Sequence, residues 1–300
     1  MTVTVNDVVQ NCGPDLKTTK RHSLGIIYAE ESGRGLTHPF FVLIIEAFKK
    51  EAEARGYDVT FINQKTDPDD FSYLEHCTDG NVSGLCIICA DYDSPRIRSL
   101  ISSDIPCVTV DHMFRRNPAV LSDNETDVRK LVEYAIQKGH RRIAYIHGQN
   151  NSLVTRTRIS QFSSIMDFYH LPVPPEYIKE GVYNDIQLTR SLVLDLLALP
   201  DRPTCILLPD DFAYLGAQEA TMQLGLSIPG DIPFGGYDGI PLTQALEPRL
   251  TTIRQSTDQM GATAAQRLMN LIEHPTPMDK RPVIFPVELI EGETIGSVVG

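Results

Sequence analysis

Short apolar runs alternate with amphipathic helical segments along this chain from about residue 23 onward. The runs recur every 25 to 35 residues or so, roughly the spacing of right-handed crossovers between parallel strands. Eight runs are expected to be strands: Leu24–Ala29, Tyr57–Ile62, Leu85–Cys89, Cys107–Val110, Ile143–His147, Ile178–Tyr183, Cys205–Leu208 and a weaker one near Phe234. The pattern predicts an α/β fold with parallel sheets flanked by helices.

The segments between the strands carry signals for helix starts and ends. Polar residues that can accept from free backbone N–H groups precede the apolar stripes, and glycines follow them. Two of the starts have the spacing of a capping box, in which two side chains cap each other's backbone. The expected helices run from Thr37 to Gly56, from Ser122 (with Glu125) to Gly139, from Asp211 to Gly225, and onward from Ser256 (with Gln259).

The length of 300 residues exceeds the size at which one hydrophobic core keeps growing, so two lobes are expected. Four strand–helix units precede Ser122 and about four follow it; a helix and a late strand, Val283–Glu288, then remain after Leu250. Such an addition would cross back between the lobes and bring Gln255 into the cleft. The expected division is 1–21 as a leading segment, 22–122 plus 256–281 as the N-terminal lobe, and 123–255 plus 282–300 as the C-terminal lobe.

The charge balance constrains the partners. A net charge of −12 argues against a broad nucleic-acid surface, which needs a basic footprint. The one dense basic cluster, Lys17, Lys20 and Arg21 beside His22, is interpreted as a solvated linker rather than a phosphate contact. No apolar run approaches the roughly 18 residues of a membrane span, and Met1 to Gln10 lack a secretory signal pattern. The sequence therefore predicts a cytoplasmic protein.

The cysteines and the missing catalytic motifs argue against metal, cofactor or covalent chemistry. Cys86 and Cys89 have CxxC spacing, but they lie in a predicted strand, where positions i and i+3 face opposite sides. No phosphate loop, HExxH or GxSxG motif is present, and Gly33-Arg34-Gly35 matches a dinucleotide turn only in part. We expect no cofactor, no metal site and no enzyme activity.

Polar and aromatic residues stand at the ends of several predicted strands, where an α/β sheet places its ligand crevice. Carboxylates accept hydroxyl hydrogens, arginine and amide groups donate, and aromatic faces stack on the CH patches of sugars. A polyhydroxyl ligand would thus find acceptors, donors and faces in the residues Asp111, Asp210, Asp238, Arg158, Gln255, Phe40, Phe41 and Tyr183.

Structural roles remain open for most of these residues. Asp210 or its neighbour Asp211 could cap the next helix, with capping favoured for Asp211. Asp238 could be a turn residue, and Arg158 a surface charge. The aromatic residues could be core.

Several segments, in order and spacing from about residue 22 to 295, together resemble the effector-binding core of the lac-repressor (LacI/GalR) family of transcription regulators. They are Gly25-Ile26-Ile27, His38-Pro39-Phe40-Phe41, Gly139-His140-Arg141-Arg142-Ile143-Ala144, Asp211-Phe212-Ala213-Tyr214-Leu215-Gly216-Ala217, Ile228-Pro229-Gly230-Asp231-Ile232, Gly236-Tyr237-Asp238 and Leu250-Thr251-Thr252-Ile253-Arg254-Gln255. The resemblance implies the two-lobed periplasmic-binding-protein fold (type I) with three crossovers, an effector between the lobes, and a homodimer.

The resemblance also implies roles for single residues. Arg158, Asp238 and Gln255 would contact the effector, Tyr183 would stack on it, and Phe40 with Phe41 would close the N-lobe side. Two positions depart from the family pattern: Asp210 replaces a frequent asparagine, and Gln161 a glycine. The first departure argues against transferring any particular sugar specificity.

The front of the chain departs further. Members of the family begin with a helix-turn-helix headpiece and a hinge helix that bind DNA. Val3 to Gly13 resemble the first headpiece helix, and Leu16 to Lys20 the end of the hinge, with Leu16 and Lys17 as DNA-contacting positions. Residues 1–21 are interpreted as a remnant that lacks the recognition helix. This interpretation predicts a sensor without its own sequence-specific DNA binding, whereas operator DNA is a partner of complete members.

A LacI-type effector-binding domain is the leading function, with ligand-driven lobe closure as its mechanism. The alternatives are a periplasmic-type sugar receptor for transport, a stand-alone sensor, and a sugar-modifying enzyme using Asp210 and Asp238 as paired carboxylates. The acidic lining favours a neutral sugar over a sugar phosphate or a purine, because a phosphate requires more cationic partners.

Overall fold

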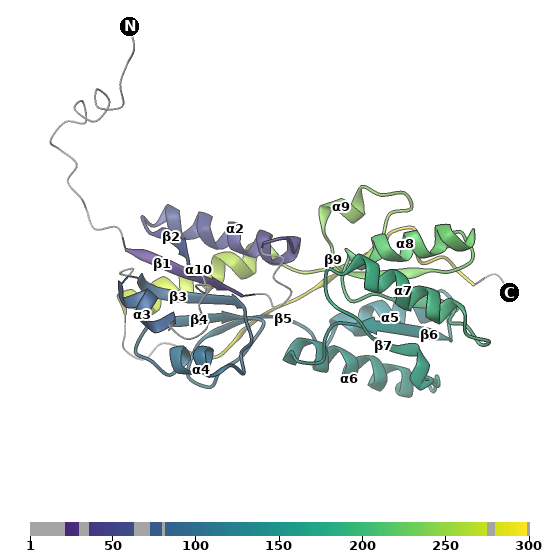
Figure 1. Cartoon of the computed structure of the whole chain (residues 1–300), viewed down its shortest axis with the longest axis horizontal. Helices are drawn as coiled ribbons and strands as arrows, with labels where there is room; N and C mark the ends of the chain where they lie inside the picture. Colours follow the sequence, from purple (N-terminus) through teal and green to yellow (C-terminus); the bar gives the residue numbers. More distant parts are fainter. Residues whose placement is uncertain (1–21, 30–35, 63–72, 80–81, 275–279, 299–300) are drawn as a thin grey trace, which may run out of the picture.

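The computed structural model describes residues 22–29, 36–62, 73–79, 82–274 and 280–298, which form two lobes side by side (Figure 1). Each lobe holds a six-stranded sheet. Hydrophobic clusters lie on both faces of each sheet, so every sheet is the middle layer of three. This arrangement is the expected α/β, two-lobed periplasmic-binding-protein-like fold.

The first lobe contains the sheet ordered β11-β5-β4-β3-β1-β2, with all neighbours parallel. Its strands are β1 (Ser23–Tyr28), β2 (Asp58–Phe61), β3 (Val82–Cys89), β4 (Cys107–Val110), β5 (Ala119–Ser122) and β11 (Val283–Phe285). Helices α2 (Pro39–Ala54) and α10 (Thr257–Glu273) cover one face, and α3 (Tyr73–Asp79) and α4 (Pro95–Ile101) the other.

The second lobe contains the sheet ordered β12-β10-β9-β8-β6-β7, in which only β12 is antiparallel to its neighbour. Its strands are β6 (Ile143–His147), β7 (Ile178–Glu180), β8 (Cys205–Leu207), β9 (Phe234–Asp238), β10 (Thr251–Arg254) and β12 (Glu288–Ile290). Helices α5 (Asp127–Gln137) and α6 (Leu153–Phe168) cover one face, and α7 (Ile186–Leu197) and α8 (Ala213–Leu224) the other. A 3₁₀ turn, η1 (Pro175–Tyr177), and the short α9 (Pro241–Gln244) complete the lobe.

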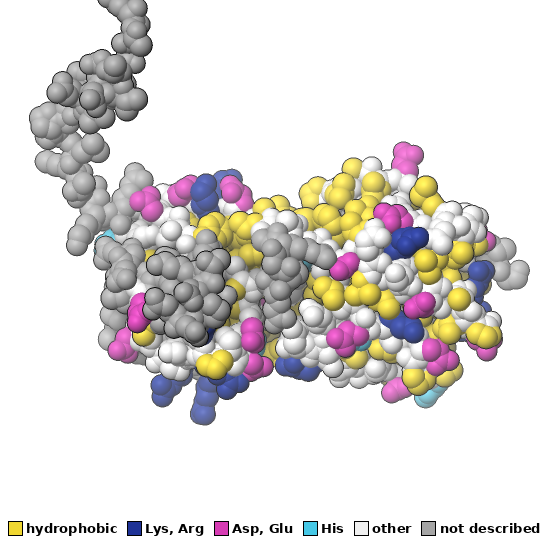
Figure 2. Space-filling view, in the orientation of Figure 1, with side chains coloured by type: hydrophobic (Ala, Val, Ile, Leu, Met, Phe, Trp, Pro, Cys, Tyr) yellow, Lys and Arg dark blue, Asp and Glu magenta, His cyan; other side chains and the backbone are white. Residues whose placement is uncertain are grey.

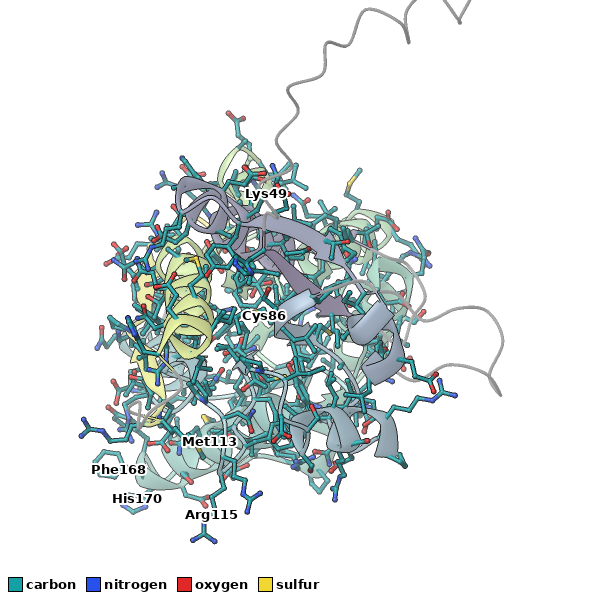
Figure 3. The ribbon with its side chains drawn as sticks, turned by 90° about the vertical axis from the view of Figure 1, so that its left-hand side faces the viewer. Lys49, Cys86, Met113, Arg115, Phe168 and His170 are labelled. Carbon is teal, nitrogen blue, oxygen red and sulfur yellow. The ribbon has the colours of Figure 1, made fainter. Side chains whose placement is uncertain are left out.

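Strands covered on both faces are apolar along their whole length, which explains why the strand predictions succeed. β4 and β6 are buried at every position. Cys86 lies in the core beneath α2, deep inside the lobe in Figure 3, whereas Cys89, three positions on, lines the space between the lobes. The two thiols therefore diverge as expected, and no disulfide joins the cysteines within the described residues.

Helices α2 and α10 approach each other closely over the first sheet because Gly261 lacks a side chain. A Cβ atom on Gly261 would lie 2.3 Å from the carbonyl oxygen of Ile44 in α2. The contact brings Met260, Ala264 and Leu268 onto the core of the first lobe. The last long helix of the chain thereby completes the lobe with which the described chain begins.

Three connections cross between the lobes, as the family resemblance implies. They follow β5, β10 and β11. Hydrogen bonds join the connections: the Asp123 amide donates to the Phe285 carbonyl at 2.9 Å, and the Ser256 hydroxyl donates to the Pro286 carbonyl at 3.0 Å. The three crossing segments therefore lie together as one hinge.

The structure corrects several sequence-based boundaries. The late strand expected at Val283–Glu288 is two strands, β11 in the first sheet and β12 in the second, so 283–285 belong to the first lobe and not to the second. β5 was not predicted. Its last residue, Ser122, is therefore in a strand and does not cap α5, which begins at Asp127.

The other helix starts are also shifted. α2 begins at Pro39 after His38 rather than Thr37, and α8 begins at Ala213 rather than Asp211. Ser256 does precede α10, but its hydroxyl bonds to Pro286 and not back to its own helix. The leading segment 1–21, with Leu16 and Lys17, lies outside the described residues.

The surface carries charges of both signs. Acidic and basic side chains are interspersed over the face shown in Figure 2, which is consistent with the net charge of −12. Among the described residues, no helix has the length and hydropathy that would allow it to cross a membrane.

Candidate functional site

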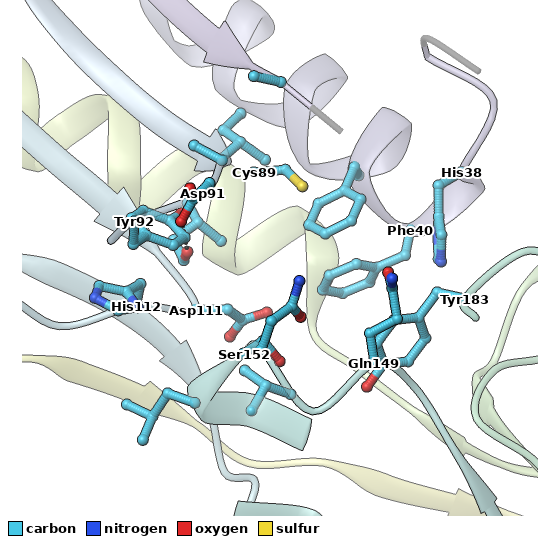
Figure 4. A pocket seen from close by; sticks show the side chains of 18 of the residues that line it. His38, Phe40, Cys89, Asp91, Tyr92, Asp111, His112, Gln149, Ser152 and Tyr183 are labelled. Carbon is cyan, nitrogen blue, oxygen red and sulfur yellow. Dashed lines mark hydrogen bonds between the residues drawn. The ribbon is translucent and has the colours of Figure 1, made fainter. Parts of the chain in front are cut away.

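A cleft of about 1270 Å³, counted with its open mouth, lies between the lobes (Figure 4). It opens where the carboxyl ends of strands from both sheets meet, the place where open α/β sheets bind ligands. The lining residues that carry the argument below are His38, Phe40, Phe41, Tyr92, Asp111, His112, Arg158, Tyr183, Asp238 and Gln255.

Seven of the eight site residues predicted from the sequence line this cleft. They come from six places that are far apart in the chain: α2, α6 and the ends of β4, β7, β9 and β10. The exception is Asp210, which does not contribute to the lining.

Aromatic rings from both lobes face the cleft. Phe40 and Phe41, at the start of α2, are in edge contact with ring centroids 5.0 Å apart, and His38 lies 5.2 Å from Phe41. On the second lobe, the hydroxyl of Tyr183 shares a 2.9 Å hydrogen bond with Thr155. Such rings stack well on the CH face of a sugar.

The ring of Tyr183 lies against the chain at Gly148, just after β6. A Cβ atom at this position would stand 2.0 Å from the ring. Only glycine at position 148 therefore allows this position of the ring, because the Tyr183 ring occupies the space that a side chain of residue 148 would fill.

A chain of hydrogen bonds connects the polar residues across the two lobes. The Ser122 amide donates to Oδ1 of Asp111 at 3.0 Å, and the Ser122 hydroxyl donates to Oε1 of Gln255. The Gln255 amide donates to Oδ1 of Asp238 at 2.8 Å, and Nε2 of His38 lies 4.0 Å from Oδ2 of Asp238. The sequence-based placement of Gln255 between the lobes is thus correct.

The backbone is strained at these carboxylates. Four non-glycine residues among those described have a positive φ, and three are at or beside the cleft: Asp111 at 52°, Asn184 at 59° and Asp238 at 110°. Positive φ costs such residues roughly 1–3 kcal/mol each, so it persists where the surroundings impose it, often at ligand sites.

Burial changes the protonation of the site. It raises the pKa of Asp238 well above its usual range, and the nearby carboxyl groups of Asp211 and Asp210 add to the effect. Burial likewise raises the pKa of Asp111, against the opposing influence of the Ser122 amide. A protonated carboxyl both donates and accepts, which suits a hydroxyl group.

Arg158 is buried in α6, and its partners hold it firmly. Nε donates to Oδ1 of Asn124 at 3.1 Å and lies 3.3 Å from Oδ2 of Asp127. The guanidinium carbon lies 3.5 Å from the centroid of the Tyr237 ring. The side chain reaches the cleft from this fixed support, so it is no free surface charge.

Neither Asp210 nor Asp211 lines the cleft, and neither is the N-cap residue of α8, which is Phe212. Oδ1 of Asp210 accepts from the backbone amide of Ala213 at 2.8 Å, and Oδ2 accepts from the backbone amide of Asn184 at 2.6 Å. Asp211 instead accepts from the Ile240 amide and from the hydroxyls of Thr243 and Thr252. Asp210 and Asp238 therefore do not face the cleft as a pair, which removes the basis for the glycosidase-like alternative.

Sequence reasoning missed part of the lining. Tyr92 and His112 stack in parallel, with centroids 4.0 Å apart and planes 7° apart, and Figure 4 places them at the opposite end of the cleft from Tyr183. They follow β3 and β4, so the strand-end rule could have found them. The loop after β6 and the first turn of α6 also contribute residues to the lining, between Gln149 and Arg156.

The cleft lining offers hydrogen-bond donors, hydrogen-bond acceptors and aromatic faces. Within the described residues, no group of three His, Cys, Asp or Glu side chains is placed to hold a metal ion. The fold and cleft together define a two-lobed binding protein with its ligand site at the hinge.

Residues 21–291 match the family described as periplasmic binding proteins and sugar binding domain of the LacI family. The chain belongs to this family, and it corresponds to the effector-binding domain of LacI-type regulators.

Individual relatives agree with this assignment. The HTH-type transcriptional repressor PurR of Haemophilus influenzae (strain PittEE) is 30% identical over 262 residues, covering 86% of this chain and 76% of the relative. The ribose operon repressor of Escherichia coli (strain K12) is 28% identical and covers 92% and 83%. A putative transcriptional regulator LacI from Bacillus cereus subsp. cytotoxis has a solved structure with a TM-score of 0.85 and 25% identity, covering 93% of this chain and all of that one.

Proposed function

We propose that this chain is the sensor of a LacI-family regulator and binds a neutral sugar between its lobes. The observation that carries the proposal is the convergence of Arg158, Asp238 and Gln255 on a cleft walled by aromatic rings. The donors and acceptors suit hydroxyl groups, and the rings suit the CH face of a sugar. A relative named as a ribose operon repressor supports this ligand class.

Ligand binding acts by favouring the closed arrangement of the lobes. The lobes already touch beside the cleft, where the side-chain amide of Asn184 in the second lobe donates to the Thr37 hydroxyl of the first lobe at 3.2 Å. A ligand that contacts both walls adds affinity only when the lobes are close, and that difference in affinity shifts the equilibrium.

The partners follow from the family. We infer a homodimer in the cytoplasm, coupled to operator DNA in members with a complete headpiece, and a function in binding rather than catalysis. Relatives named as transcriptional repressors support this inference. Sedimentation of the purified chain would test the dimer, and an electrophoretic shift with operator-like DNA would test direct DNA binding.

The direct test is thermal stability against a panel of neutral sugars, sugar phosphates and purines. A ligand at about 100 times its dissociation constant stabilises the folded state by roughly 2.7 kcal/mol, which moves the melting temperature visibly. We expect a shift with a neutral sugar that is lost in Asp238→Ala and Arg158→Ala. The control, Asp195→Ala, removes an exposed carboxylate from α7, and should leave the shift unchanged. A shift only with phosphates or purines would overturn the proposed ligand class.

A further inference from the structure

The buried ion pair between Asp127 and Arg158 lies directly behind the cleft. Asp127 is the first residue of α5 and is fully buried, and it is not part of the cleft lining. Arg158 is the only cation among the buried residues that the structure describes. The charge that a ligand meets at Arg158 therefore depends on a residue that the ligand never touches.

We propose that Asp127 determines ligand specificity: by neutralising Arg158 it makes the cleft select neutral polyhydroxyl ligands over analogues that carry a carboxylate or phosphate. This inference rests on the proposed function, because it concerns the ligand of the same cleft. It assigns Asp127 a positioning role, exerted through Arg158.

The contacts of Asp127 stabilise the charged form of its carboxyl group beside the arginine. Oδ2 lies 3.3 Å from Nε of Arg158 and also accepts from the Tyr237 hydroxyl, while Oδ1 accepts from the Val128 amide. The start of a helix is a favourable place for a negative charge. Burial raises the pKa of the Asp127 carboxyl, and Arg158, the Tyr237 hydroxyl and the Val128 amide oppose that rise.

The same contacts divide the guanidinium into two sides. Nε is engaged by Asp127 and Asn124, and the Tyr237 ring covers the plane at 3.5 Å. Within the described part of the chain, neither Nη group of Arg158 has a hydrogen-bond partner, and the side chain lines the cleft. The ligand thus meets strong N–H donors whose positive charge is already balanced.

A hydroxyl group and an anionic group respond differently to this arrangement. A hydroxyl oxygen needs a donor, which the Nη groups provide. A carboxylate or phosphate needs net positive charge to offset its lost hydration. The one buried arginine that it meets is already paired with Asp127, and two more aspartates, Asp111 and Asp238, line the same cleft. The other arginine in the lining, Arg156, is exposed and donates to the Asn150 carbonyl at the mouth.

The test compares matched ligand pairs in the full chain and in Asp127→Asn. The pairs are D-glucose with D-glucuronate, D-galactose with D-galacturonate, and D-ribose with D-ribose 5-phosphate, measured by titration calorimetry and melting temperature. We expect the wild type to bind a neutral member and Asp127→Asn to shift the preference toward its anionic partner by at least about tenfold, roughly 1.4 kcal/mol. Glu133→Gln removes one charge from the same helix, where it pairs with Arg129 at the surface, and should leave the preference unchanged.

The outcomes separate this inference from the proposed function. If the wild type binds a neutral sugar and a folded Asp127→Asn keeps the same preference, the role of Asp127 is wrong and the proposed function stands. If the wild type prefers the anionic members, or binds none of the sugars, both are wrong. Should Asp127→Asn unfold alone, the anionic ligand is expected to restore folding by pairing with Arg158, and failure to do so overturns the inference.

Discussion

The two lobes bury different kinds of side chain, although their sheets and helices are arranged alike. The second lobe buries the aspartate and arginine side chains of Asp127, Arg158, Asp210, Asp211 and Asp238, whereas the buried polar residues of the first lobe are His38, Thr109 and Ser122. The first lobe is therefore held mainly by apolar packing, and the second also by buried electrostatics. The difference teaches that most of the buried charge beside the cleft belongs to the second lobe, while the first lobe adds Asp111 to the lining.

The largest effect tests the packing of the first lobe. Phe48 is fully buried in the core between α2 and α10, and Phe48→Ala should lower the free energy of unfolding by about 3–5 kcal/mol. No charge is involved, so urea unfolding should give the same loss at pH 5.5 and pH 7.5. A loss that depended on pH would contradict the conclusion that apolar packing, and not buried charge, stabilises the first lobe.

The second prediction breaks the ion pair of the second lobe. Arg158→Met leaves the Asp127 carboxylate buried without its cation, and we expect a loss of about 3 kcal/mol at pH 7.5. Without Arg158 the pKa of Asp127 rises in the folded protein, so protonation relieves the cost as the pH falls. Urea unfolding should show a smaller loss at pH 5.5, and an equal loss at both pH values would contradict the prediction.

The third prediction concerns Asp211. Burial raises the pKa of this carboxyl to about 7, above its value in the unfolded chain. Its contribution to stability is therefore fully present below the unfolded pKa and is lost as the pH rises through about 7. Asp211→Asn should flatten the pH dependence of unfolding by on the order of 1–4 kcal/mol between about pH 4 and pH 8. An unchanged slope would show that Asp211 titrates normally.

The smallest effect on stability is expected at Gly148. In Gly148→Ala the new Cβ displaces the Tyr183 ring into the cleft, which should weaken sugar binding by about tenfold, roughly 1.4 kcal/mol. The melting temperature without ligand should change little, because the ring can move toward open space. In a Tyr183→Ala background the ring is absent, so adding Gly148→Ala should cause no further loss of affinity relative to Tyr183→Ala alone. A further loss would show that the new methyl group clashes with something other than the Tyr183 ring.

Most of the fold was predictable because parallel strands covered on both faces leave unbroken apolar runs. β4 and β6 match their predicted bounds for this reason. β5 is as long as β4, but it was missed because its last residue, Ser122, was interpreted as the start of a helix. The late strand was predicted as one element because only Pro286 and Val287 separate β11 from β12.

The site was predictable where a residue follows a strand and unpredictable where its role depends on a distant partner. Seven expected residues line the cleft. Asp210 and Asp211 are neighbours with equal chemistry, and only the position of Thr243 and Thr252 shows which one is enclosed. The role of Asp127 was not predicted, because the arginine with which it pairs lies 31 positions away in the sequence.

The joined crossing segments determine how the molecule can move. Hydrogen bonds join Ser122 to Gln255, Asp123 to Phe285, and Ser256 to Pro286, so we expect the three connections to bend together as one hinge. Gln255 belongs both to this hinge and to the wall of the cleft. A ligand that binds Gln255 would therefore contact the hinge itself. A small rotation of the hinge would move the far ends of both lobes by a larger distance.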